Sequence, residues 1–400
     1  MVQGALTRAS RVEPNPTVPA EPTVPTACVA WVAHPSRQLR LLRLLRPSHP
    51  SCPSKESKVT DQPMTARPRT RGRKTWSALG DPGRRPTEYE IVTHGLDHTL
   101  GDPPLELAPD APGNRRLREH RDLIPLKVPD PDAFRDPDAL TYGGYVAMQD
   151  DQETYVEGLL ERFDGERHDE RLTPHALDFL ALTLTPCRYL AHGTQMLSAY
   201  VQQLAPGSYL ANCATFQTAD QLRRVQLLAY RTTQLRRTRP GRGFATGERA
   251  IWENHALWQP IRRAIEEALV EYDWDRAFVA TQLVVKPLTD ALFLDLLGRE
   301  LDAVAAPLDA LIVDNLARDA RRSRRWTLAA LDFLVSAAPG NRAVLQGHLD
   351  TWAEHGRAIA HAGGLLLARS GDRDADEITG AAMADWRTLL EPAELTAARG

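Results

Sequence analysis

Two helical segments of this 400-residue chain each carry an aspartate and an arginine three residues apart. Residues 212–235 contain Asp220 and Arg223, and residues 311–333 contain Asp319 and Arg322. In di-iron carboxylate bundles, two facing helices each supply a Glu-x-x-His pair whose carboxylate and imidazole lie one turn apart. Here aspartate takes the place of glutamate and arginine the place of histidine. Because arginine stays protonated and has no lone pair to donate, these four residues are predicted to be degenerate ligand positions.

The rest of the expected metal-binding layer is also incomplete. A di-iron centre needs about four carboxylates and two imidazoles from four facing helices. The helix expected at residues 186–204 contains no Asp or Glu, and His192 is the one imidazole near this layer. Each remaining acid is expected to be neutralised by a neighbouring guanidinium. The sequence therefore predicts no catalytic, cofactor-binding or metal-binding residue in this chain.

The two Asp-x-x-Arg turns must then have another role. An Asp–Arg pair on an exposed helix contributes only about 0.2–0.5 kcal/mol. A buried network could instead fix the register of the helices, at a desolvation cost that packing must offset. Two unrelated, solvated pairs are the alternative. The buried network is favoured because both turns occur in similar helices about 100 residues apart.

A cluster of arginines precedes Trp326 and could suggest binding to nucleic acid. On a helix, however, these positions spread around much of the circumference, and Asp314 and Asp319 lie on the same helix. The net charge of -3 also argues against bulk attraction to nucleic acid or to an anionic membrane. Structural or intersubunit ion pairs are favoured over this alternative, a free-standing helical protein that binds nucleic acid or another anionic partner. The cluster consists of Arg318, Arg321, Arg322, Arg324 and Arg325.

Composition is ordinary for a soluble globular protein, with 42% hydrophobic and 25% charged residues. The four cysteines, Cys28, Cys52, Cys187 and Cys213, include no close pair, which excludes a zinc motif and a disulfide framework. No run approaches 18 apolar residues, so no membrane-spanning helix is expected. Neither a Gly-x-Ser-x-Gly elbow nor a phosphate-binding loop is present. A cytoplasmic location is the interpretation that fits these features best.

The N-terminal part of the chain has two styles of sequence. Residues 1–63 are rich in Pro, Thr and Ser and are expected to be a disordered extension. The favoured interpretation is that residues 1–63 lie upstream of the true translation start. Met64 would serve as the alternative start. Residues 64–140 are proline-dense, with isolated apolar anchors, and predict an extended arm without a core of its own. Such an arm must lie along its own bundle or along a partner.

The remainder is expected to be helical and to contain very little strand, since no segment alternates apolar and polar residues between turns. Residues 141–370 are predicted to form the bundle, and residues 371–400 a tail with a surface helix around Trp386. Proline and glycine mark several helix boundaries. The main helices are expected at 147–163, 186–204, 212–235, 277–297, 301–336 and 341–368.

Between Thr75 and Trp352 the chain resembles the small (β) hydroxylase subunit of bacterial multicomponent monooxygenases, the soluble di-iron enzymes that oxidise toluene, phenol, alkenes or isoprene. The resemblance depends on the order and spacing of several short motifs. It departs from the family at Gly143-Gly144, where a basic pair is expected. The motifs are RRPTEYE at 84–90, RDP at 135–137, LTY at 140–142, Pro206 with NCA at 212–214, DQLRRVQ at 220–226, YDW at 272–274, SRRW at 323–326 and NR at 341–342.

The resemblance implies a ferritin-like helical bundle that pairs with a larger α subunit of the same fold, which would hold the di-iron centre. It further implies an α2β2γ2 hydroxylase that works with an effector protein, a Rieske ferredoxin and a flavin reductase, and no nucleic-acid or membrane partner. The proline-rich arm would lie across the α subunit, with Trp76, Arg85, Tyr89 and Tyr142 as suspected interface residues. The family has no catalytic residue in this subunit.

Overall fold

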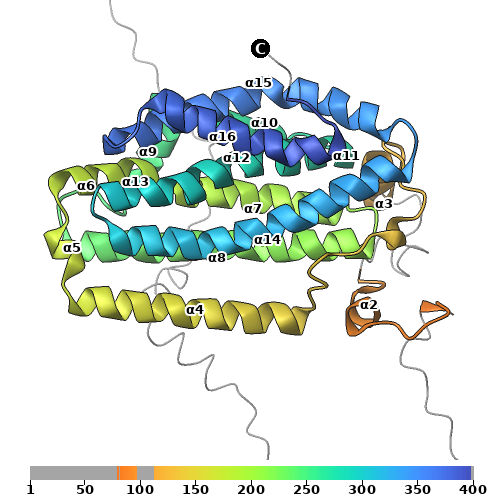
Figure 1. Ribbon diagram of the computed structural model, residues 1–400, viewed down its shortest axis with the longest axis horizontal. Coiled ribbons are helices and arrows are strands. Elements are labelled where there is room, and N and C mark those ends of the chain that lie inside the picture. The colour runs from red at the N-terminus through yellow and green to blue at the C-terminus, as the bar shows by residue number, and fades with distance from the viewer. Residues whose placement is uncertain (1–78, 81, 97–111, 398–400) are drawn as a thin grey trace, which may run out of the picture. The chain divides into compact units, whose positions relative to one another are not determined.

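The computed structural model describes residues 79–80, 82–96 and 112–397, and every regular element among them is helical (Figure 1). The expectation of an all-α protein is therefore confirmed for this part of the chain. Residues 1–63, expected to be a disordered extension, lie outside the described residues. The α-helices are α2 (Glu88–Thr93), α3 (Pro112–Leu117), α4 (Tyr142–Gly165), α5 (His168–Arg171), α6 (Pro174–Phe179), α7 (Cys187–Gln203), α8 (Ser208–Thr238), α9 (Glu248–Asn254), α10 (Gln259–Ala268), α11 (Trp274–Phe278), α12 (Lys286–Asp290), α13 (Leu297–Ala303), α14 (Pro307–Ala337), α15 (Asn341–Leu367) and α16 (Ala375–Leu390).

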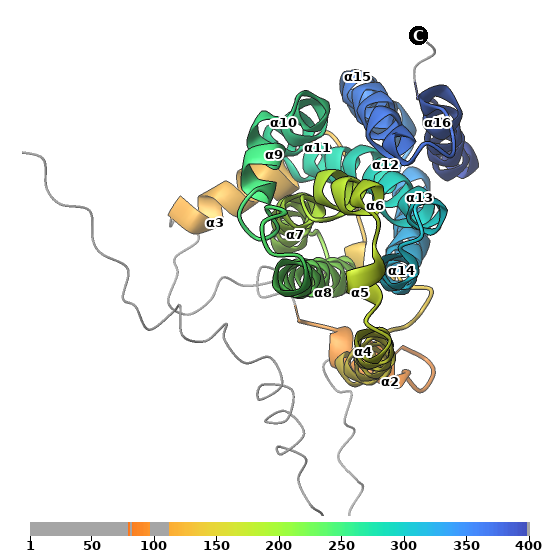
Figure 2. The ribbon, with the colours of Figure 1, turned by 90° about the vertical axis from the view of Figure 1, so that its left-hand side faces the viewer.

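The long helices pack in layers. Helix α4 lies against α8 and α14 on one side, and α15 and α16 lie on the opposite side of the bundle, beyond α12 (Figures 1 and 2). Helix α4 begins at Tyr142 even though Gly143 and Gly144 follow, because the Thr141 hydroxyl accepts a hydrogen bond from the Gly144 N–H and caps the first turn. The layers bring α4 alongside α8 and α14.

One continuous helical rod runs through the core from Trp274 to Ala303. It alternates α-helical turns with two π-helical segments, η8 (Val279–Val285) and η9 (Ala291–Leu296). This rod is long and apolar enough to cross a membrane, but 94% of its apolar window is buried inside the protein. Its apolar character is therefore explained by packing in the core.

The single helix expected at 301–336 is instead two helices, α13 and α14. The chain turns between them at Ala305, whose φ of 59° is in the left-handed region. Pro307 then occupies the first turn of α14. Proline lacks a backbone N–H and has a fixed φ, so it suits the start of a helix and disfavours its interior. The turn lets α14 fold back along α13.

The C-terminal segment is not a surface tail, contrary to the expectation for residues 371–400. In α16, Trp386 has an exposed fraction of 0% and its indole N–H donates to the Leu283 carbonyl. The indole ring lies where a side chain at Gly356 would be, since a Cβ there would come within 2.5 Å of it. Helix α16 is therefore part of the core.

The described parts of the arm lie along the chain's own bundle. Ile124, Leu126 and Phe134 are buried, and the Phe134 ring lies 5.7 Å from that of Phe333 in α14. The Asn341 side chain accepts from the Lys127 N–H and donates to the Lys127 carbonyl. The arm was expected to lie either along its own bundle or along a partner, and these residues lie along the bundle.

Candidate functional site

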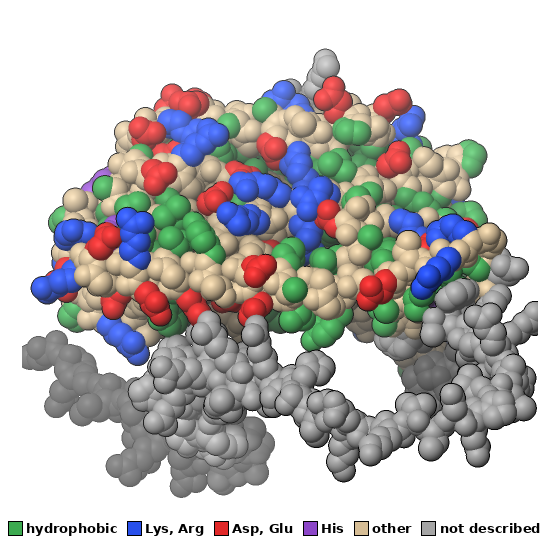
Figure 3. All heavy atoms as spheres, turned by 60° about the horizontal axis from the view of Figure 1, so that its bottom comes forward, with side chains coloured by type: hydrophobic (Ala, Val, Ile, Leu, Met, Phe, Trp, Pro, Cys, Tyr) green, Lys and Arg blue, Asp and Glu red, His purple; other side chains and the backbone are tan. Residues whose placement is uncertain are grey.

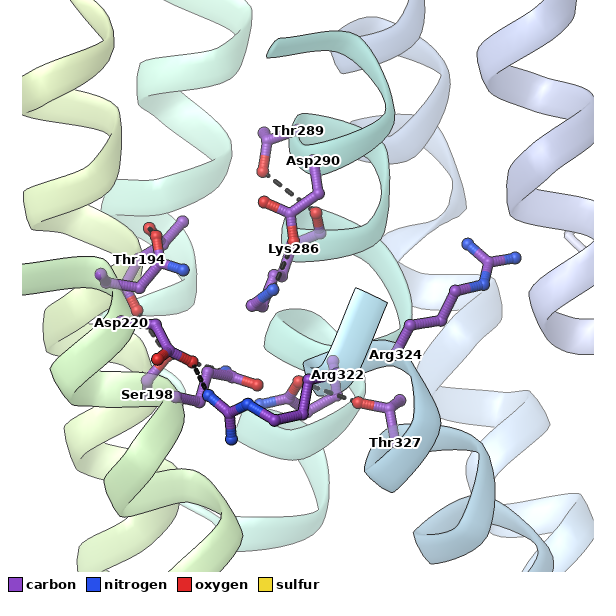
Figure 4. Close-up of polar contacts among 12 residues, drawn as sticks. Thr194, Ser198, Asp220, Lys286, Thr289, Asp290, Arg322, Arg324 and Thr327 are labelled. Atoms are coloured by element: carbon purple, nitrogen blue, oxygen red, sulfur yellow. Dashed lines mark hydrogen bonds and ion pairs between the residues drawn. The ribbon is translucent and has the colours of Figure 1, made fainter. Parts of the chain in front are cut away.

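Helices α8 and α14 place the two Asp-x-x-Arg turns opposite each other. Arg223 Nη1 donates to Asp319 Oδ2 at 3.0 Å. Arg322 Nη2 donates to Asp220 Oδ2 (Figure 4). Pairing 220 with 322 and 223 with 319 is possible because the two helices run antiparallel. Each acid is therefore paired with a guanidinium of the other helix, in a buried network that joins α8 and α14. We call these four buried residues the Asp–Arg lattice.

Helix α4 closes the Asp–Arg lattice with neutral polar side chains. The Tyr145 hydroxyl donates to Asp220 at 3.1 Å, and Gln149 Nε2 lies 3.2 Å from Asp220 and 3.0 Å from Asp319. Gln152 Nε2 donates to Asp319 at 3.0 Å. These three residues have i, i+4 and i+7 spacing, which places them on one face of α4. Sequence analysis missed them, although this spacing of polar residues could have indicated a polar inward face.

Burial determines the protonation chemistry of the Asp–Arg lattice. Desolvation raises the pKa of the Asp220 carboxyl to about 7, and the charge of Arg322 opposes this effect. Burial also raises the pKa of the Tyr145 phenol, and the neighbouring Asp220 raises it further. The tyrosine therefore stays protonated and acts as a hydrogen-bond donor, while the charged form of Asp220 depends on Arg322.

The Asp–Arg lattice does not have the donors that iron would need. Guanidinium groups cannot ligate a metal, and both carboxylates already accept hydrogen bonds from guanidinium, amide or phenol groups. Across residues 112–397 and the short described stretches before them, no cluster of three or more His, Cys, Asp and Glu is arranged to hold a metal ion. The arrangement supports packing and register instead of redox chemistry.

A second buried ion cluster lies further along α8. Arg231 donates from Nε to Asp309 at 2.7 Å and from Nη1 to Asp169 at 2.6 Å. Burial opposes the charge on Arg231, but the two carboxylates more than compensate and raise its pKa. Asp309 is fully buried at the start of α14, and Asp169 belongs to α5. Three helices are therefore joined through one guanidinium.

A third cluster lies in the core rod. Asp290 is paired with the ammonium of Lys286, one turn earlier (Figure 4). It is also paired with Arg224 Nη1 of α8 at 3.3 Å. The exposed fraction of Lys286 is only 3%. Sequence analysis did not identify this cluster; Lys286 and Asp290, four residues apart in an apolar run, were the available indication.

The arginine cluster of α14 is engaged in contacts within the protein, as the ion-pair interpretation predicted. Blue and red side chains are interspersed on the face shown in Figure 3, without a continuous basic stripe. This arrangement provides no support for the nucleic-acid alternative. The contacts are Arg318 over the Tyr155 ring, Arg321 with Asp295 and Asp314, Arg322 with Asp220, Arg324 with Asp385, and Arg325 with Asp138.

The suspected interface residues have different environments. Tyr142 has an exposed fraction of 75%, and Arg85 is also exposed. Tyr89 is only 4% exposed, and its hydroxyl accepts a hydrogen bond from the Asp136 N–H at 3.2 Å. The Tyr89 side chain thus holds the arm on its own bundle and is not available to a partner. Trp76 lies outside the described residues.

Glu90 connects the short helix α2 to the loop that precedes α4. Its carboxylate accepts from Arg84 Nη1 at 2.8 Å, from the Thr87 N–H at 2.8 Å and from Arg135 Nε at 3.3 Å. The hydrogen bond from Arg84 and that from the Thr87 N–H hold the pKa of Glu90 well below its ordinary value. Glu90 is therefore the ionic clamp of this part of the arm.

Acid is expected to release this clamp. Since the folded-state pKa of Glu90 lies below its unfolded value of 4.5, its stabilising effect is complete above that pH and is lost as pH falls toward the folded-state pKa. Hydrogen exchange of the α2 amides should show protection that decreases below pH 4.5. In Glu90→Gln the protection should already be roughly tenfold lower at pH 7 and nearly independent of pH. Equal acid sensitivity in both proteins would contradict the assignment.

Comparison with known proteins agrees with this geometry. The family model described as methane/phenol/alkene hydroxylase matches residues 115–338. The β subunit of the hydroxylase component of the toluene-4-monooxygenase system of Ectopseudomonas mendocina is 39% identical over 281 residues, covering 70% of this chain and 86% of that subunit. A phenol 2-monooxygenase oxygenase component of Pseudomonas sp. (strain CF600) is 23% identical over 266 residues, covering 66% of this chain and 76% of that protein.

Two solved structures share the fold. A structure of toluene 4-monooxygenase with toluene bound in the resting active site has a chain that aligns with a TM-score of 0.70 and 36% identity, covering 78% of this chain and all of that one. Phenol hydroxylase from Pseudomonas sp. OX1 aligns with a TM-score of 0.71, covering 86% of this chain and all of that one. At 19% identity, the second alignment supports the fold alone.

The helical layers and these structural neighbours define a ferritin-like hydroxylase subunit. The chain belongs to the methane, phenol and alkene hydroxylase family. Within that family it is homologous to the β subunit of the toluene 4-monooxygenase hydroxylase component.

Proposed function

We propose that this chain is the non-catalytic β subunit of the hydroxylase of an NADH-dependent monooxygenase that inserts one oxygen atom into a small aromatic or alkene. Its partner would be a larger α subunit that contains the di-iron centre. The Asp–Arg lattice carries this proposal. These four residues would lie in the layer where a bundle of this kind holds its metal, and their guanidinium groups pair with both carboxylates.

In this proposal the chain's own residues have a mechanical role. The Asp–Arg lattice and the Arg231 cluster hold α4, α5, α8 and α14 in one register, so that the outer face of the bundle has a fixed shape. Tyr142 and Val146, one turn apart at the start of α4, are exposed apolar side chains of the kind that interfaces cover. A bundle face of fixed shape that carries such side chains would be suited to a large, obligate interface with the α subunit.

The wider assembly follows from the resemblance and belongs to the same proposal. The chain would form an α2β2γ2 hydroxylase in the cytoplasm and work with an effector protein, a Rieske ferredoxin and a flavin reductase. The substrate pocket would then lie in the α subunit, and the four lattice residues would be former ligand positions.

Co-expression with the candidate α subunit, followed by size-exclusion chromatography and iron analysis, tests the proposal. The two chains should co-elute, and iron should be present only in fractions that contain the α subunit. The chain alone should bind no stoichiometric iron. About two irons per isolated chain, the content of a complete di-iron site, would refute the non-catalytic role. If the chain does not bind the α subunit but binds DNA in a salt-sensitive manner, the result would instead support the alternative of a free-standing protein that binds an anionic partner.

A further inference from the structure

A small cleft of about 40 Å³ lies between α12 and α14. Its inner wall includes Gln282, Lys286, Asp290, Ser323 and Thr327, which are all buried. At its mouth, Arg321 is paired with Asp295, and Arg324 with Asp385, and these pairs are partly exposed. A cleft of this volume can hold one water molecule or one small ion.

Several hydrogen-bond donors of the inner wall have fewer acceptors than they can use. An ammonium carries three N–H donors, and within the described chain Asp290 is the one hydrogen-bond acceptor for the Lys286 ammonium. Among the residues that the structure describes, neither the Gln282 amide nitrogen nor the Ser323 hydroxyl has a hydrogen-bond partner, although both are buried. The Gln282 amide oxygen already accepts from the Thr327 hydroxyl at 3.3 Å. Since a buried donor without an acceptor is costly, this wall is suited to a guest that accepts hydrogen bonds.

The charges at this wall also favour an acceptor. Lys286 and Arg224 are two cations that share one carboxylate, Asp290, which leaves an excess of one positive charge. At the mouth, two arginines pair with the two aspartates that line the cleft. A third acid, Asp314, also pairs with Arg321, but its side chain is 56% exposed, where solvent screens its charge. The charges of the neighbouring Asp–Arg lattice are balanced too, since its two arginines pair with its two aspartates. Glu153 also pairs with Arg223, but its side chain is 41% exposed, where solvent screens its charge.

The backbone around Lys286 is unusual in the same place. The short helix α12 has one π-helical segment directly before it and another directly after it. Such π-helical turns are uncommon and frequently occur at functional sites. The two π-helical segments flank the turn that carries Lys286, so the unusual backbone and the proposed wall of the cleft coincide.

We propose that this cleft is a binding site for a small monovalent anion such as chloride, held by the Lys286 ammonium, the Gln282 amide nitrogen and the Ser323 hydroxyl. Water fits the volume, but it brings two hydrogens that need acceptors of their own. An anion only accepts, and it neutralises the excess charge. The site is separate from the proposed contact with an α subunit and does not depend on it.

Crystals of the full-length chain grown with bromide in place of chloride test the site directly. An anomalous peak between Lys286, Gln282 and Ser323 is expected, and it should be absent in Lys286→Met. Gln282→Glu, which keeps the side-chain volume and places a carboxylate in the cleft, should also abolish the peak. An ordered water in the cleft, with bromide bound only elsewhere, would overturn the proposal.

Thermal unfolding provides the measurement in solution. At constant ionic strength, replacing gluconate by chloride should raise the Tm of the unmodified chain by about 2–4 °C through preferential binding to the folded state. The shift should persist in Arg262→Ala, a control on α10 that breaks a partly exposed ion pair, and should disappear in Gln282→Glu. An equal chloride shift in all three proteins would show that the effect is not due to the cleft.

Discussion

Replacing Arg322 by methionine is expected to lower the free energy of unfolding by about 3–5 kcal/mol, because the change leaves the Asp220 carboxylate buried without its cationic partner. The hydrogen bonds from Tyr145 and Gln149 remain, but neither supplies a compensating charge. Desolvation already raises the pKa of Asp220 to about 7 in the presence of Arg322. Without that guanidinium the carboxyl should be neutral at pH 7, and the variant should lose stability as pH rises. Urea unfolding monitored by circular dichroism would measure both effects.

Arg321 is a matched control, because it is the preceding residue of the same helix and its side chain is 52% exposed in its pairs with Asp295 and Asp314. Arg321→Met should cost less than about 1 kcal/mol. The double variant Asp220→Leu/Arg322→Met removes both charges and should be more stable than Arg322→Met, although the Tyr145 hydroxyl loses its acceptor. Equal losses for Arg321→Met and Arg322→Met would refute the structural importance of the Asp–Arg lattice.

Arg231→Met is expected to cause a loss of similar size or larger, about 4–5 kcal/mol, because it leaves two carboxylates without their shared partner. Asp309 is fully buried, so its charged form has no access to water in the variant. Lowering the pH should therefore recover part of the lost stability, and raising it should increase the loss.

Arg249→Met is the corresponding surface control. Its side chain is 74% exposed and pairs with Glu253 one turn away in α9. The expected cost is below about 1 kcal/mol and should hardly depend on pH between 5 and 8. Thermal and urea unfolding of both variants over that pH range would compare them. A pH-independent loss in Arg231→Met would indicate that the lost packing of the long side chain, and not the unpaired carboxylates, is responsible.

Much of the helical architecture could be predicted, because helix starts and ends are encoded locally. Thr173 caps α6 with Pro174 at its first position, and α15 begins at Asn341 as expected. The break at Ala305 was missed, since the residues around it are good helix formers and only Pro307 indicated it. The burial of Trp386 was also missed, because the contact that receives its ring comes from Gly356, thirty residues earlier.

The chemistry of the two Asp-x-x-Arg turns was determined by the sequence alone. Whether a side chain can donate a lone pair to a metal is a property of its atoms. A protonated guanidinium has no such lone pair in any fold. The pairing was decided only by the tertiary structure. Asp220 could bond to an arginine of its own helix or of another, and the antiparallel approach of α8 and α14 selected Arg322. Burial then decided the strength of that pair, and the position of α4 decided which neutral side chains complete it. The proposed role of Lys286 could not be predicted from the sequence either, because segments far apart in the chain line the cleft and only folding brings them together.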